Sequence, residues 1–155
     1  MTVTSAAREA SAVSNDDDAT RGVIAQRLDA LWDIRPASLR DVAAEISEET
    51  GRHVSAAYLG QLRQGTRAEP SYSIIAAIAK YFGVTPDYFF TDERTARQTE
   101  DELRLLHALR DSDVRSIVLH ADGLSPKSLA AIADIVRTYR AAEGLPEAPD
   151  PPADV

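Results

Sequence analysis

Apolar residues along this chain recur at spacings of three and four, the period of an α-helix, and no segment alternates as a half-buried strand does. Five such stripes fill the N-terminal half, the last of them a short turn that Pro86 can start. They predict a core made of Ile24, Leu28, Leu31 and Trp32, then Leu39, Val42, Ala43 and Ile46, then Leu59 and Leu62, then Ile74, Ile75, Ile78, Ala79 and Phe82, and finally Tyr88, Phe89 and Phe90. The pattern indicates an all-α fold with a five-helix N-terminal domain.

Start and stop signals define the second and third of these helices. Ser38, followed by Asp41, is similar to a capping box, and Gly51 can end that helix in the left-handed conformation. Ser55 can cap the next helix and Gly65 can end it. The chain therefore offers two helices separated by a short turn.

A second, smaller helical unit is predicted beyond a charged linker. Residues 92–99 hold no apolar side chain larger than Ala96, and three amphipathic helices follow within residues 100–144. Three short helices make too small a core to be stable alone. The stripe on the last helix can pack within its own chain or form a homodimer seam, and we favour the seam because two-fold association is the commonest oligomer. That stripe consists of Leu129, Ile132, Ala133, Val136 and Tyr139.

Both ends of the chain have compositions that favour disorder. Residues 1–19 are small and polar, and residues 145–155 hold four prolines and no basic residue. The predicted organisation is a disordered tail over 1–19, a helical domain over 20–91, a linker over 92–99, a dimerisation domain over 100–144, and a Pro-rich acidic tail over 145–155.

The net charge of −8 is unevenly distributed along the chain. Residues 20–90 carry eight basic and eight acidic side chains, whereas residues 1–19 contribute −3 and residues 91–155 contribute −5. We interpret the run Asp16–Asp18 as a solvated tail, with mimicry of DNA as the alternative. Between Arg52 and Arg67 there are three arginines and no carboxylate, and a helix without acids suits a polyanion.

The residue inventory argues against a metal centre, a cofactor and an enzyme. The chain has no cysteine, and His53, His107 and His120 lack metal-binding spacing. It has no nucleophile elbow with Ser, His and Asp in order, no glycine-rich phosphate loop and no paired carboxylates at a plausible pocket. No apolar run is long enough to span a bilayer and no secretory signal core is present, so the expected location is the cytoplasm.

The predicted third helix has the outward face that reading a DNA major groove requires. Gln61 can bond adenine bidentately, while Ala56 and Ala57 can let the helix approach closely or touch a thymine methyl. Tyr58 can reach a base edge or a phosphate, or instead cover the hydrophobic base of the helix. We expect Arg63 to pair with an acid of a neighbouring helix. With the flanking residues that suit phosphate contacts, the predicted DNA-binding set is Arg52, Ser55, Ala56, Ala57, Tyr58, Gln61, Gln64, Thr66 and Arg67.

Two stretches carry a resemblance to a known family. VSAAYLGQLRQGTRAEPS from Val54 and AIAKYFGV from Ala77 resemble the lambda-repressor/Cro-like (XRE) helix-turn-helix family over about residues 22–90. Together with DELRLLHALRDSDVRSI from Asp101, HADGL and RAAEGL, they are similar to the actinobacterial EspR-type transcription regulators, to about residue 145. The resemblance implies a dimer with an N-terminal DNA-binding domain and a C-terminal helical dimerisation domain, and association with the nucleoid in some members. It also implies base-facing residues at Ala56, Ala57 and Gln61 and a phosphate contact at Gln64.

These observations together predict a homodimeric transcription regulator that binds double-stranded DNA in the nucleoid. Two alanines on the reading face leave few side chains to bond bases, so modest sequence specificity is expected. The alternative is a protein-interaction module, with RNA polymerase, a sigma factor or a toxin as partner and DNA binding as incidental. The acidity of the chain and of its two tails favours that alternative. Neither interpretation implies a small-molecule ligand or a cofactor.

Overall fold

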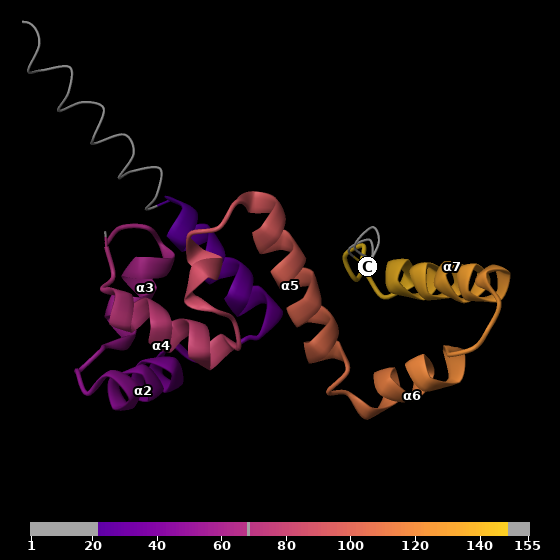
Figure 1. The fold of residues 1–155 in the computed structure, drawn as a ribbon. Coiled ribbons are helices and arrows are strands. Elements are labelled where there is room, and N and C mark those ends of the chain that lie inside the picture. Colours follow the sequence, from indigo (N-terminus) through magenta and orange to yellow (C-terminus); the bar gives the residue numbers. More distant parts are fainter. Residues whose placement is uncertain (1–21, 68, 149–155) are drawn as a thin grey trace, which may run out of the picture. The chain divides into compact units, whose positions relative to one another are not determined.

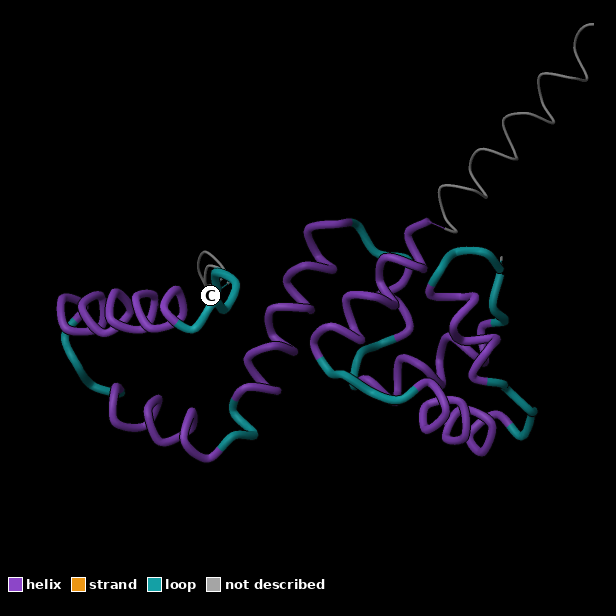
Figure 2. The backbone as a smooth tube through the Cα atoms, turned by 180° about the vertical axis from the view of Figure 1, so that it is seen from behind, coloured by secondary structure: helices purple, strands orange, loops and turns teal. Residues whose placement is uncertain are grey.

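The computed structural model describes residues 22–67 and 69–148, and every regular element in this part of the chain is helical (Figures 1 and 2). The all-α prediction is confirmed. A helix over residues 22–34 comes first, followed by α2 (Leu39–Thr50), α3 (Ala56–Arg63), α4 (Tyr72–Phe82), the 3₁₀ turn η1 (Pro86–Phe89), α5 (Glu93–Ala108), α6 (Ser112–Ala121) and α7 (Pro126–Ala142). The predicted tail over 1–19, and all of the predicted C-terminal tail except residues 145–148, lie outside the described residues.

The chain divides into two compact units, with the boundary between Glu100 and Asp101. The first unit has a core at the predicted positions, and Leu28, Ile46, Leu59 and Ile78 are at most 1% exposed. Leu39 and Ile74 are half-buried. Ile34 and Val54, which the spacing did not single out, are also buried. Apolar spacing thus predicted this core well, because a helix buries one continuous stripe of its surface.

Phe90 differs from the prediction. Tyr88 and Phe89 are buried and their rings meet edge to face at 5.2 Å, but Phe90 is 59% exposed. The 3₁₀ turn ends at Phe89, and Phe90 follows as its C-terminal flanking residue. Successive side chains in a turn point in different directions, so three consecutive aromatics do not share one buried side.

The predicted linker over 92–99 also differs, because residues 93–99 form the first turns of α5. The Asp92 carboxylate accepts hydrogen bonds from the Thr95 amide and hydroxyl at 3.0 and 2.7 Å, as at a helix start. Ala96 is fully buried against the first unit, and Glu100 is buried one turn later. The buried side of these first turns consists of a small and a charged residue, so residues 93–100 carry no apolar stripe.

The second unit has a different character, since none of its described residues is buried. Of the fourteen large hydrophobic side chains exposed in the described part of the chain, twelve lie here. They are Leu105, Leu106, Val114, Ile117, Val118, Leu119, Leu124, Leu129, Ile135, Val136, Tyr139 and Leu145. Within the described residues, no helix combines the length and apolar character needed to cross a membrane.

Candidate nucleic-acid interface

Helices α2 and α3 form the helix-turn-helix of the first unit, with α4 packed against α2 (Figure 1). Helix α2 ends at Gly51, whose φ of 65° is left-handed. The chain then extends to Ser55, whose hydroxyl accepts a hydrogen bond from the Tyr58 amide at 3.1 Å and caps α3. The predicted start and stop signals are therefore confirmed here, because each acts within one turn of helix.

A hydroxyl inside α2 fixes the turn that leads into α3. Ser47 Oγ accepts a hydrogen bond from the Val54 amide at 2.9 Å and donates to the Ala43 carbonyl at 2.7 Å. Val54 is 6% exposed, so its amide needs this partner inside the protein. The sequence did not point to Ser47, because a serine inside a helix has no distinctive pattern. Its role becomes visible only when Val54 is seen to lie beside it.

The inner side of α3 is held by both neighbouring helices. Leu59 and Leu62 are buried, and a Cβ added at Gly60 would lie 3.7 Å from the Leu39 side chain of α2. Arg63 forms an ion pair with Asp29 of the first helix at 2.8 Å and lies over the Trp32 ring at 5.0 Å. The prediction that Arg63 pairs with an acid of a neighbouring helix is confirmed. These contacts with the first helix and with α2 fix the position of α3 within the first unit.

The outer side of α3 carries no acidic residue. Ala57, Gln61 and Gln64 are exposed, while Ala56 and Tyr58 are half-buried. The guanidinium carbon of Arg67 lies 5.0 Å from the centre of the Tyr58 ring, a cation–π contact that places a basic group beside the helix. The structure thus brings Tyr58, Gln61 and Arg67 to one exposed surface.

The remaining predicted DNA-binding residues lie at the two ends of α3. Arg52 is exposed in the turn before the helix. Ser55 serves as the cap and is half-buried. Thr66 lies after the helix, where its amide and hydroxyl donate to the Gln61 carbonyl at 3.1 and 3.2 Å. No group of three His, Cys, Asp or Glu side chains that could hold a metal ion occurs within residues 22–67 and 69–148.

Acidic side chains gather instead on α2. Asp41, Glu45, Glu48 and Glu49 line an open hollow along the exposed side of that helix. Glu49 also pairs with Lys80 of α4 at 2.7 Å. These four acids lie on α2, whereas α3 itself has none. A polyanion is repelled less by a helix without acids than by the acidic side of α2.

The loop between α3 and α4 contains a strained residue. Glu69 has a φ of 57°, the left-handed region that favours glycine, and it is the only non-glycine residue with positive φ in the described part of the chain. It precedes Pro70, which further restricts its backbone. Its carboxylate lies two positions after Arg67, close in sequence to the predicted phosphate contacts.

Replacing Glu69 by glycine is expected to stabilise the protein by up to about 1 kcal/mol, the left-handed penalty less the chain entropy of glycine. For a unit of this size, that free energy corresponds to a rise in Tm of roughly 4–8 °C in thermal unfolding. Glu69→Ala is the matched control, because it removes the same charge and keeps the strain. Both variants should bind DNA more tightly at low salt. An equal rise in Tm for both would contradict the backbone argument.

Comparisons with known proteins agree with this geometry. A helix-turn-helix family model matches residues 41–89, which include most of α2, all of α3 and α4, and η1. Two relatives, both named nucleoid-associated protein EspR and from Mycobacterium tuberculosis strains H37Rv and CDC 1551 / Oshkosh, are each 35% identical over 127 residues. Each match covers 78% of this chain and 95% of the relative, so the likeness extends beyond the helix-turn-helix into the second unit.

Proposed function

Since the chain belongs to the family of the nucleoid-associated protein EspR, we propose that it is a homodimeric, DNA-binding transcription regulator of the nucleoid that catalyses no reaction. One observation carries this proposal above the others. The outer side of α3 is free of acids, while Arg63 ties the helix to Asp29 and Ser47 fixes the turn that precedes it. This is the arrangement by which a helix enters a major groove.

Each residue of the α3 side has a role in the proposal. Gln61 reads a base, and Ala56 and Ala57 allow the helix to approach the base edges closely. Phosphates are bound around these three residues and fix the register of the helix. The groups that bind them are the side chains of Arg52, Tyr58, Gln64, Thr66 and Arg67 and the amides of the α3 start capped by Ser55.

We assign Tyr58 to a contact with the DNA phosphate backbone because of its contact with Arg67. Tyr58 is half-buried and its ring lies beneath the Arg67 guanidinium, and its hydroxyl is the group that can bond a phosphate. With alanines at two of the three base-facing positions, affinity rests mainly on phosphates and groove shape. We therefore propose modest sequence specificity, as suits a protein that occupies many sites.

The second unit supplies the dimer seam. In the single chain Val136 and Tyr139 are 46% and 66% exposed, and no described residue of this unit is buried. Soluble proteins rarely expose so much apolar surface without a partner. The seam proposed on α7 consists of Leu129, Ile132, Ala133, Val136 and Tyr139, with a second copy of the chain as partner. Pairing two DNA-binding units raises the effective concentration of the second at the DNA.

A gel-shift titration tests the proposed function directly. Random genomic fragments are titrated with the full chain at low and at moderate salt, and binding should weaken steeply as salt rises. Absence of a shift at both salt concentrations would refute DNA binding and favour the protein-interaction alternative, with the acidic side of α2 as its first candidate surface.

Two substitutions separate the predicted base contact from the predicted phosphate contact. Gln61→Ala is expected to reduce the free energy of binding to preferred DNA sequences by about 1–3 kcal/mol, because a bidentate base contact is lost. Binding to other sequences should change little. Arg67→Ala should weaken binding to all DNA sequences equally. It should also reduce the slope of log affinity against log salt concentration by about one for each DNA-binding unit that is bound. Affinities are measured on a preferred and a scrambled duplex at several salt concentrations. An unchanged salt slope for Arg67→Ala would show that the docking assignment is wrong.

A further inference from the structure

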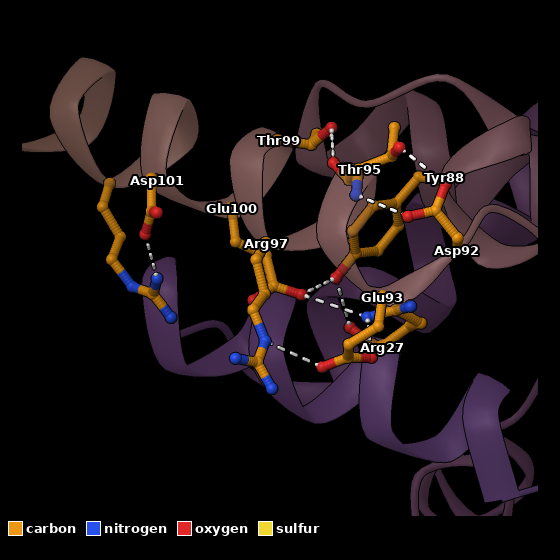
Figure 3. A network of polar contacts seen from close by, with 10 residues as sticks. Arg27, Tyr88, Asp92, Glu93, Thr95, Arg97, Thr99, Glu100 and Asp101 are labelled. Atoms are coloured by element: carbon orange, nitrogen blue, oxygen red, sulfur yellow. Dashed lines mark hydrogen bonds and ion pairs between the residues drawn. The ribbon is translucent and has the colours of Figure 1, made fainter. Parts of the chain in front are cut away.

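A buried cluster of charged and polar groups joins the first helix, η1 and α5 (Figure 3). Arg27 and Glu100 are only 5% and 8% exposed, although both are charged residues. Arg27 Nη1 lies 3.1 Å from Glu93 Oε2 and 3.8 Å from Glu100 Oε1. The Tyr88 hydroxyl donates to Glu100 Oε1 at 2.7 Å, and the Arg27 guanidinium carbon lies 5.7 Å from the Tyr88 ring centre.

A gain in folding stability alone does not account for this buried cluster. Burying an ion pair removes two charges from water, and that cost offsets most of their attraction. Arg27 Nε, moreover, has no hydrogen-bond partner within the described residues. Breaking such a pair is nevertheless expensive, because the remaining charge is left buried alone. Separating Arg27 from Glu100 is therefore unfavourable, whatever the intact pair adds to stability.

All the partners on α5 lie in its first turns. Glu93 contacts Arg27, and Ala96 is fully buried. Glu100, two turns after Glu93, also contacts Arg27. Arg97 donates to Glu93 at 2.9 Å, and this hydrogen bond, together with the charge of Arg27, lowers the pKa of Glu93 below its ordinary value. The Glu93 carboxylate is ionised at neutral pH, as an ordinary glutamate is, and the lowered pKa extends its pairing with Arg27 to more acidic pH.

We propose that Arg27 is a positioning residue for DNA binding by the dimer. With Tyr88 and Glu100 it holds residues 93–100 against the rest of the DNA-binding unit, so that this segment does not widen the range of distances between the two DNA-binding units, here called the heads. The proposal rests on the proposed function. A free segment of eight residues would span roughly 15 Å as a flexible coil. At 3.4 Å per base pair, its release in one protomer would widen the tolerated spacing between half-sites by about four base pairs.

Spacing preference is the first test. Duplexes carrying two copies of a preferred site, separated in steps of one base pair, are titrated with the full-length protein and with Arg27→Met. The wild type should show a narrow optimum. Arg27→Met should flatten it, with the ratio of best to worst affinity falling about tenfold, while single-site affinity stays within about twofold. Lys80→Met is the matched control, because it also replaces one positive charge by methionine, but at the exposed Lys80–Glu49 ion pair.

Limited trypsin digestion is the second test, and it does not depend on DNA. Arg94 and Arg97 lie in the first turns of α5 and are cleaved only when those turns open. Arg52, in the exposed turn after α2, is the reference. Arg27→Met should raise cleavage after Arg94 and Arg97 about tenfold, with cleavage after Arg52 unchanged. Equal acceleration at all three sites would mean global destabilisation and would overturn the proposal.

A gentler variant covers the case in which Arg27→Met does not fold. Tyr88→Phe keeps the buried ring and removes only the hydroxyl that bonds Glu100, so it should show the same two effects at smaller amplitude. A spacing profile that stays narrow in both variants overturns the positioning role. If the wild type already tolerates all spacings, the spacing role is refuted, and if it binds no DNA, the proposed function is refuted. In both cases the digestion still decides whether Arg27 holds α5.

Discussion

Replacing Val136 by aspartate is expected to convert the proposed dimer to a monomer and to weaken DNA binding by about a hundredfold, the usual order of an avidity effect. Val136 lies in the middle of the proposed seam on α7, with Ile132 and Ala133 one turn before it and Tyr139 after it. A carboxylate there would have to be buried without a partner when two copies associate. Mass measurement by light scattering and a gel-shift titration of the same samples would report both effects.

Thr138→Asp is the matched control for this substitution. Threonine and valine have the same shape, Thr138 is exposed, and it lies on the opposite side of α7 from the seam. The control should remain a dimer with nearly unchanged affinity for DNA. A Val136→Asp variant that stays dimeric would locate the interface elsewhere. A monomeric variant with full affinity would show that one head is sufficient for binding.

The second large effect is expected on the reading side of α3. Replacing Ala57 by glutamate should reduce affinity for all DNA sequences by at least about a hundredfold, because a carboxylate in the groove faces phosphates and base edges at close range. Ala57 is exposed and lies in the first turn of α3, which holds no acid. An acid near a helix N-terminus stabilises the helix, so lost binding would not reflect lost folding.

Ala44→Glu provides the control for charge. This variant has the same net charge as Ala57→Glu, but the added carboxylate lies on the exposed side of α2, among the acids of the hollow. It should bind DNA within a few fold of the wild type, and thermal unfolding should show both variants folded. Equal losses of affinity in the two variants would mean that only net charge matters. The assignment of α3 as the reading helix would then be wrong.

Local signals in the sequence predicted most of the DNA-binding unit. Ser55 and Gly65 mark the two ends of α3, and Leu59 and Leu62 mark its inner side, as the structure confirms. Such signals are readable because a cap or a buried stripe depends on residues within one or two turns of each other. The family resemblance was readable for the same reason, because it rests on contiguous stretches of sequence.

The two errors have different physical origins. Residues 92–99 were predicted as a linker because they lack large apolar side chains, yet Ala96 packs fully buried and Glu100 is compensated by Arg27 from the first helix. Phe90 was predicted in the core because it follows two buried aromatics, yet the chain turns at that point. Burial of the first turns of α5 was decided by a helix distant in sequence, whereas the exposure of Phe90 follows from the local geometry of the turn.

The sequence by itself therefore determined the all-helical class, the ends of α2 and α3, and the acid-free face that makes α3 suitable for DNA. Only the tertiary structure decided how the turn is locked by Ser47, how Arg63 is engaged by Asp29, and how α5 is held by Arg27. The reason is the range of the interactions. Helix propensity and capping act between neighbours along the chain, whereas buried hydrogen bonds and ion pairs exist only after distant segments have met.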